Sequence, residues 1–265
     1  MVENTVLGKG NKMKRRFVVN EPMTYYPRCI DLCRNNHILI GGRTGSGKSV
    51  LLNNFLYSMM AFTPVENKFY LIDPKRVELS WYKNTSHCIG YADSVSSAID
   101  ILCRAINTME NRYKEMERRH IRTYDGAYIY VVIDELADLM LSAKKLVMPL
   151  IQKIGQLGRA ARVFLICATQ APSRKVIPAE ITLNLGCKIA LSCESGIESR
   201  QVIGMNGAEL LPRYGECIIK TADCTKKYKV DITPESKLNE RISYWEHNRG
   251  KIAIFGKCTP HSVID

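Results

Sequence analysis

Residues 37–50 read HILIGGRTGSGKSV, and this stretch decides the fold. The apolar run HILIG (37–41) is typical of a buried strand, and GRTGSGKS (42–49) matches the phosphate-binding pattern G-x-x-x-x-G-K-[ST] in full. The residues that follow predict a helix from Lys48 to about Ala61. Because a phosphate-binding loop joins a strand to a helix, this context favours a nucleotide site over a simple glycine turn.

Each residue type in this loop has a physical role. The glycines let successive backbone N–H groups face a phosphate without a Cβ in the way, and the following helix directs its positive end at the same anion. Lys48 is expected to contact the β- and γ-phosphates of ATP, and the hydroxyl of Ser49 to ligate Mg²⁺. The expected nucleotide-binding set is Gly42, Arg43, Thr44, Gly45, Ser46, Gly47, Lys48, Ser49 and Val50.

Two acids follow a second apolar strand, in the segment VVIDE (131–135). Asp134 at the strand end is predicted to hold the Mg²⁺ through a bound water. Glu135 is predicted to orient and deprotonate the attacking water, which indicates hydrolysis instead of transfer to another substrate. Alone, the pair is also compatible with two solvated acids at a strand end. The phosphate loop upstream makes the catalytic interpretation the stronger one.

A third polar strand end is expected after RVFLICA (162–168), where Thr169 and Gln170 follow. Ligands of parallel sheets bind at the carboxyl ends of strands, so Gln170 is predicted to contact the γ-phosphate. The guanine-reading Asn-Lys-x-Asp pattern is absent, since Asn67-Lys68 leads into Phe69. Small kinases do not usually need an acidic pair. ATP hydrolysis is therefore the predicted reaction.

Strands and helices alternate through most of the chain. Apolar strands and the helices between them indicate an α/β fold with a mostly parallel sheet covered on both faces, followed by a C-terminal β-hairpin and helix. The other expected strands are 68–73, 87–91, 128–134 and 186–192; the hairpin pairs 214–220 with 226–232; helices are expected over 94–120 and from Thr233 to about Asn248.

The composition is basic and otherwise ordinary for a globular protein. The 265 residues carry a formal net charge of +12, which favours a polyanionic partner such as nucleic acid. No stretch has the roughly 18 consecutive apolar residues of a membrane span, and the first residues lack a secretory signal. The ten cysteines form no Cys-x-x-Cys pair, which argues against zinc. A cytoplasmic location is expected, with recruitment to a membrane left open.

Several segments beyond the generic motifs make the chain resemble the motor domain of the FtsK/SpoIIIE family of DNA translocases, over about residues 36–251. Besides residues 37–50, these segments are LIDPKRVELSWY (71–82), MENRYKEM (109–116), VVIDELADLM (131–140), GRAARVFLICATQAPS (158–173) and SGIESRQVIG (195–204). The resemblance implies a RecA-like sheet, ATP hydrolysis between the subunits of a hexamer, and double-stranded DNA threaded through the ring and bound largely without sequence preference. It also implies that Asp73, in the step Asp73-Pro74-Lys75, lies beside the nucleotide; the alternative is a strand-ending turn.

The resemblance also gives candidates for two further roles. Arg112, Arg159 and Arg200 lie in matching motifs, and any of them could be the cation supplied in trans; a surface ion pair is the alternative for each. Arg174 and Lys175 are candidate DNA contacts, or else part of a solvated loop; they follow Gln170-Ala171-Pro172-Ser173, where the family usually has Gln-Arg-Pro-Ser.

The expected organisation is a basic N-terminal extension (1–36), a remnant of the family's preceding small domain; a motor domain (37–251); and a C-terminal tail (252–265). A compact motor of this kind resembles those of mobile elements, and would serve conjugative transfer, segregation or mobile-element maintenance, with conjugation or relaxosome proteins as further partners. Two alternatives stay open: a coupling or secretion ATPase that moves protein or nucleoprotein, and a nucleotide-gated assembly module.

Overall fold

The described part of the chain is organised by one ten-stranded sheet. The computed structural model describes residues 16–20, 27–31, 37–62, 67–230 and 232–247. In chain order the strands are β1 (Arg16–Asn20), β2 (Pro27–Asp31), β3 (Ile38–Gly41), β4 (Asn67–Ile72), β5 (Cys88–Ala92), β6 (Tyr128–Ile133), β7 (Val163–Thr169), β8 (Cys187–Ala190), β9 (Glu216–Lys220) and β10 (Thr225–Lys229). Their spatial order is β2-β1-β10-β9-β8-β3-β7-β6-β4-β5.

The sheet has a parallel half and an antiparallel half. The six strands from β8 to β5 pair in parallel, and β9, β10, β1 and β2 add to β8 in antiparallel pairs. The central strands β3, β6 and β7 are buried along almost their whole length, which explains their continuous Val, Ile and Leu content. The predicted mostly parallel α/β fold and the β9–β10 hairpin are therefore confirmed.

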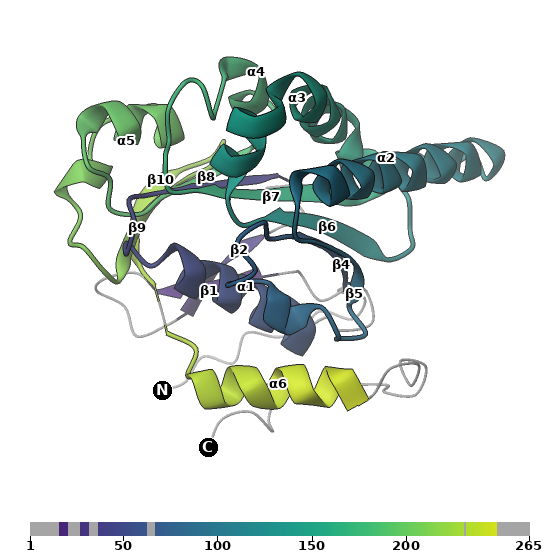
Figure 1. The fold of residues 1–265 in the computed structure, drawn as a ribbon, viewed down its shortest axis with the longest axis horizontal. Coiled ribbons are helices and arrows are strands. Elements are labelled where there is room, and N and C mark those ends of the chain that lie inside the picture. The colour runs from purple at the N-terminus through teal and green to yellow at the C-terminus, as the bar shows by residue number, and fades with distance from the viewer. Residues whose placement is uncertain (1–15, 21–26, 32–36, 63–66, 231, 248–265) are drawn as a thin grey trace, which may run out of the picture.

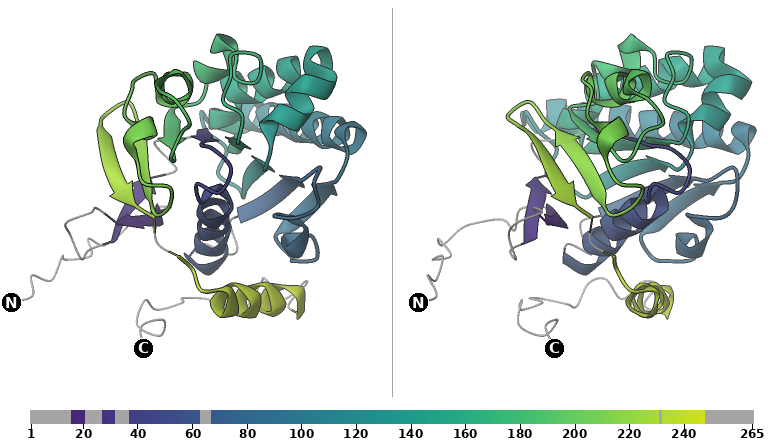
Figure 2. Two further views of the ribbon diagram at one scale, coloured as in Figure 1. Left: turned by 60° about the vertical axis from the view of Figure 1, so that its left-hand side comes forward. Right: turned by 90° about the vertical axis from the view of Figure 1, so that its left-hand side faces the viewer.

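Helices cover both faces of the sheet (Figure 1). The α-helices are α1 (Lys48–Phe62), α2 (Val95–Arg118), α3 (Leu136–Ala161), α4 (Ala179–Thr182), α5 (Gly196–Ile203) and α6 (Glu235–His247), with short 3-10 turns η2 (Ser80–Tyr82) and η3 (Ala208–Leu210). Helices α1 and α6 pack on one face and share a core with it, while α2, α3 and α5 form the core of the other face. The turned views show this division clearly (Figure 2).

The long helix α2 shows how local sequence fixes an element. Ser94 is its N-cap: the Ser94 side chain accepts a hydrogen bond from the backbone N–H of Ser97, and the Ser97 hydroxyl accepts one from the backbone N–H of Ser94. This capping box satisfies two N–H groups that the first helical turn leaves without partners. Apolar residues that recur at three- and four-residue steps, such as Ile106 and Met109, form the buried face of this helix.

Two N-terminal strands were not predicted from the sequence. β1 and β2 lie within the segment expected to be an extension, and they continue the sheet beyond β10. Pro27 begins β2, which is the edge strand, where a residue without an N–H costs no ladder hydrogen bond. The basic residues Lys9, Lys12, Lys14 and Arg15 and the expected tail 252–265 lie outside the described residues. No helix in the described ranges is long and apolar enough to cross a bilayer.

Candidate nucleotide-binding and catalytic site

The sequence motifs meet at one edge of the sheet because the parallel strands end in register. Gly41, the last residue of β3, pairs with Thr169 at the end of β7, and Ile72 of β4 pairs with Ile133 of β6. β7 lies between β3 and β6, so the strand that precedes Gln170 separates the phosphate loop from the strand that delivers Asp134. The loops after all four strands therefore leave the sheet at the same edge, where ligands of such sheets bind.

The backbone of the phosphate loop needs glycine at particular positions. Gly45 and Gly47 have φ values of 74° and 98°. Residues other than glycine rarely adopt this left-handed backbone conformation. At Gly42 a Cβ would lie 2.8 Å from Cβ of Leu191 and 2.8 Å from Oγ of Ser46. Close packing and positive φ together explain the three glycines.

The loop is held by its neighbours and keeps polar atoms available for an anion. The N–H of Arg43 donates to the carbonyl of Ser192, 2.8 Å away, which ties the loop to the segment after β8. The Ser46 hydroxyl and the Arg43 Nε are buried and have no hydrogen-bond partner among the described residues. Helix α1 begins directly after these residues, at Lys48. A turn of N–H groups at a helix start fits the phosphates of a nucleotide.

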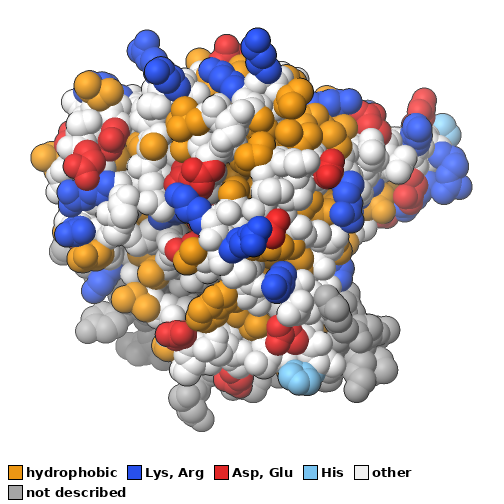
Figure 3. Space-filling model, viewed as in Figure 1, with side chains coloured by type: hydrophobic (Ala, Val, Ile, Leu, Met, Phe, Trp, Pro, Cys, Tyr) orange, Lys and Arg blue, Asp and Glu red, His pale blue; other side chains and the backbone are white. Residues whose placement is uncertain are grey.

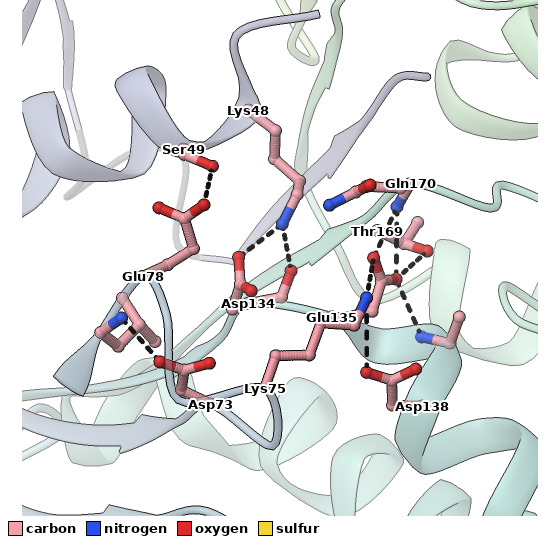
Figure 4. A network of polar contacts seen from close by, with 12 residues as sticks. Lys48, Ser49, Asp73, Lys75, Glu78, Asp134, Glu135, Asp138, Thr169 and Gln170 are labelled. Atoms are coloured by element: carbon pink, nitrogen blue, oxygen red, sulfur yellow. Dashed lines mark hydrogen bonds and ion pairs between the residues drawn. The ribbon is translucent and has the colours of Figure 1, made fainter. Parts of the chain in front are cut away.

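Lys48 and Asp134 form a buried ion pair at the centre of the site (Figure 4). Nζ of Lys48 donates to the Asp134 carboxylate and, at 2.7 Å, to the Asp134 backbone carbonyl. The two residues are only 4% and 2% exposed. The Asp134 N–H in turn donates to the carbonyl of Ile72, so β4 fixes where the acid leaves the sheet.

Ser49 has an acidic partner that the sequence analysis missed. Its hydroxyl donates to Oε1 of Glu78, 2.5 Å away, in the loop after β4. Asp73 shapes that loop: it is fully buried, and its Oδ2 accepts a hydrogen bond from the backbone N–H of Leu79 at 2.9 Å. The structure thus places Asp73 beneath the loop that presents Glu78 (Figure 4). The sequence signal that could have indicated Glu78 is its place in a loop directly after a strand, at the edge of the sheet where ligands bind.

The oxygen atoms around Ser49 suit magnesium. A serine hydroxyl and the carboxylates of Asp134 and Glu78 are hard donors, of the kind that Mg²⁺ prefers. Among the described residues no cluster of three or more His, Cys, Asp or Glu side chains forms a metal site by itself. This fits an ion bound by one or two carboxylates together with substrate phosphates and water.

Glu135 is held in place by donors from β7 and α3. Its carboxylate accepts hydrogen bonds from the Thr169 hydroxyl at 2.7 Å, the Gln170 N–H at 3.1 Å and the Ala137 N–H at 3.2 Å. The last bond makes Glu135 the N-cap of α3, where a helix favours negative charge. Lys75 lies 3.9 Å from the same carboxylate. Thr169 and Lys75 contact Glu135 but were not among the site residues expected from the sequence.

Gln170 connects β7 to the phosphate loop. Its Oε1 accepts a hydrogen bond from the Thr44 hydroxyl at 2.8 Å, while its backbone N–H contacts Glu135. The structure therefore brings together the three motifs that the sequence analysis singled out. Val50, the last residue of the expected set, is half-buried and lines a hollow of about 330 Å³ beside Glu78 and Trp81.

Arg112 is occupied within its own subunit. The residue is 8% exposed, and its guanidinium donates to the carbonyls of Ala161 at 2.7 Å and Arg162 at 3.2 Å. It also stacks over the ring of Tyr124, and burial lowers its pKa from the ordinary value. A side chain that ties α2 to the end of α3 in this way does not suit a finger acting on a neighbouring subunit.

The other candidate cations are exposed. Arg159 lies in the last turn of α3, which leads to the amino end of β7, at the opposite edge of the sheet from the phosphate loop. Arg200, in α5, donates to Oδ1 of Asn206 at 2.5 Å. Arg174 and Lys175 lie in the loop after β7. Their roles in trans or on DNA stay predictions.

The chain matches known proteins along most of its length. The model of the FtsK/SpoIIIE family matches residues 9–128 and 124–174. The chain is 36% identical to a DNA translocase FtsK of Streptococcus pneumoniae over 217 residues, covering 74% of this chain and 28% of the relative. A DNA translocase FtsK of Lactococcus lactis subsp. cremoris is 37% identical, with 74% of this chain and 29% of the relative covered. The chain thus spans less than a third of these relatives.

Solved structures share the fold. The pCW3 conjugation coupling protein TcpA, in a monomer form with ATPγS, superposes with a TM-score of 0.75 at 23% identity, covering 88% of this chain and 71% of that one. The cytoplasmic domain of the type VII secretion ATPase EccC of Thermomonospora curvata also gives 0.75, at 22% identity, with 97% and 33% covered. These neighbours confirm the predicted α/β fold. With the family match and the phosphate loop in place, the chain belongs to the FtsK/SpoIIIE family.

Proposed function

We propose that this chain is a magnesium-dependent ATPase motor that moves double-stranded DNA as a hexameric ring of identical subunits. The observation that carries the proposal is the convergence of Lys48, Asp134, Glu135 and Gln170 on one phosphate loop. The relatives named above are DNA translocases. The chemistry follows from these side chains. Coupling to DNA is supported by the relatives' names and by charge.

The phosphate loop holds the substrate and the acids hold its metal. In this proposal the loop N–H groups and Lys48 bind the β- and γ-phosphates of ATP. Ser49 would ligate Mg²⁺, Asp134 and Glu78 would hold the ion through water, and the ion would neutralise charge on the phosphates. Asp73 acts indirectly, by shaping the loop that carries Glu78.

Glu135 is the proposed general base. A water oxygen attacks the γ-phosphorus, the bond from that phosphorus to the β–γ bridging oxygen breaks, and ADP leaves with the bonding electrons. The proton released by the water passes to the Glu135 carboxylate. The hydrogen bonds from Thr169 and Gln170 orient that carboxylate, and Gln170 links it to Thr44 of the loop. A cation from a neighbouring subunit, Arg159 or Arg200, would stabilise the transferring phosphate.

Replacing Glu135 by glutamine tests the base directly. Glu135→Gln is expected to bind ATP and DNA like the wild type but to hydrolyse ATP at least about a hundredfold more slowly, because an amide cannot accept the proton. Steady-state phosphate release and nucleotide titration measure the two effects. Glu117→Gln, on the exposed face of α2, is the matched control. Turnover within twofold of wild type in Glu135→Gln would remove Glu135 from the mechanism.

The role of Glu78 has a separate test. Glu78→Gln keeps the shape of the side chain but removes the charge beside Ser49, so the Kd for ATPγS in Mg²⁺ is expected to rise roughly tenfold. In excess EDTA the same variant should bind ATPγS like the wild type. Glu240→Gln, exposed on α6, serves as the control. An equal loss of affinity for ATPγS with and without Mg²⁺ would mean that Glu78 only supports the structure of the phosphate loop.

The proposed DNA contacts begin with the loop after β7. Arg174 and Lys175 are exposed, and they lie a few residues after Thr169, the last residue of β7. In Figure 3, Lys and Arg side chains stand along the upper edge of the face, where Figure 1 has α3 and α4. Cations of this kind would contact DNA phosphates, so binding should show little sequence preference and should weaken steeply with salt.

Duplex DNA is expected to stimulate ATP hydrolysis, and the double variant Arg174→Ala/Lys175→Ala to reduce both stimulation and DNA affinity. Loss of two phosphate contacts should reduce the magnitude of the negative slope of log K against log salt by about 2. Fluorescence anisotropy with duplexes of unrelated sequence measures the slope. Hydrolysis raised by a protein partner and unaffected by duplex DNA would favour a coupling or secretion ATPase over the DNA motor.

A further inference from the structure

One cation lies against the phosphate loop outside all the motifs described above. Arg213 belongs to the loop between η3 and β9. A Cβ built on Gly45 would lie 3.5 Å from Nη2 and 3.8 Å from Nε of Arg213, and apart from Gly45 and its two chain neighbours no other described atom comes within 4 Å of it. The guanidinium therefore packs on the turn at Gly45, although 168 residues separate the two positions in the chain.

The guanidinium of Arg213 has no acidic partner in the described part of the chain. Among the described residues it makes no hydrogen bond and no ion pair; its recorded contact is with the ring of Tyr214, 5.4 Å from the ring centroid. That ring is 64% exposed. Arginine keeps its charge at every physiological pH, so an unpaired positive charge is held beside the loop. Its planar fork of N–H donors matches phosphate oxygens.

Two other cations of the site, Lys48 and Lys75, are already paired. Lys48 contacts Asp134, and Lys75 lies within ion-pair distance of Glu135 and Asp138. Arg213 is different because no acid of the described residues lies within ion-pair distance of it. The aromatic ring of Tyr214 limits the orientations of the guanidinium. It accepts no ordinary hydrogen bond from the N–H donors. An anion brought to the loop would satisfy them.

We propose that Arg213 binds the phosphate chain of a nucleotide held on the phosphate loop of its own subunit, and that Tyr214 keeps the guanidinium over the loop. The inference rests on the proposed nucleotide-binding function and extends it. Arg213 is a positioning residue here: it orients the di- or triphosphate and does not take part in proton transfer. Because Arg213 directly precedes the β9–β10 hairpin, it would also connect that hairpin to the nucleotide.

The test compares nucleotide affinity in variants of the full chain. Arg213→Ala is expected to raise the Kd for ATPγS about tenfold, the effect of one charge-assisted hydrogen-bonding group. Arg213→Lys should lose less, because a point charge remains but the planar fork is lost. Tyr214→Ala should weaken binding by a smaller factor and Tyr214→Phe should leave it unchanged. Arg118→Ala, at the exposed end of α2, is the control, and thermal melting verifies that each variant is folded.

The same measurement separates a contact within the subunit from one between subunits. At concentrations where light scattering gives the mass of a single chain, Arg213→Ala should show its full loss of affinity for ATPγS. If the chain assembles at every concentration, mixtures of Arg213→Ala and Lys48→Ala subunits decide the point: the sites with an intact loop then lack Arg213 in cis and can receive it only from a neighbour.

Each outcome has a definite meaning. Weak binding in the monomer, or in the mixtures, supports the proposal. Affinity of Arg213→Ala equal to wild type, or restored affinity in the mixtures, overturns it and leaves the proposed function standing. A wild-type chain that binds no nucleotide overturns both the proposed function and this inference.

Discussion

The buried pair of Lys48 and Asp134 is the contact on which the rest of the site depends. Two charges this far from water would be costly to bury singly, and each offsets the cost of the other. The pair also fixes the distance between the start of α1 and the end of β6. In our proposal, phosphate becomes the partner of Lys48 and the metal becomes the partner of Asp134. Nucleotide binding then exchanges ionic contacts and leaves neither charge uncompensated.

β7 connects the phosphate loop to the strand end that carries Asp134 and Glu135. The strand lies between β3 and β6, and its end touches both: Gln170 accepts from Thr44 of the phosphate loop, and Thr169 donates to Glu135. The loop with Arg174 and Lys175 follows a few residues later. A displacement of that loop by a bound polymer would therefore pass through Gln170 to both the phosphates and the proposed base. This short path is a physical reason to expect hydrolysis and DNA contact to be linked.

Local pattern explains what could be predicted from the sequence. The phosphate loop, the acids at 134–135 and the β9–β10 hairpin are each encoded within a few residues, so they could be read without knowing the packing. Glu78 and Arg213 could not, because their contacts with Ser49 and Gly45 join distant segments. The burial of Arg112 could not be predicted for a similar reason, because its motif gives no sign that α2 packs against α3 at this residue. β1 and β2 were missed because each has only five residues and prolines at 22 and 27 argue against a regular element in this segment.

Calorimetric titration of magnesium ATPγS into the wild-type chain and into Lys48→Ala tests the nucleotide cradle most directly. We predict saturable binding of one nucleotide per wild-type chain and a loss of at least a hundredfold in affinity for Lys48→Ala, since the variant removes the one buried cation facing the phosphates and leaves Asp134 unpaired. Equal affinity in the two proteins would contradict the assignment of this loop as the ATP site. So would a wild-type chain that binds no nucleotide.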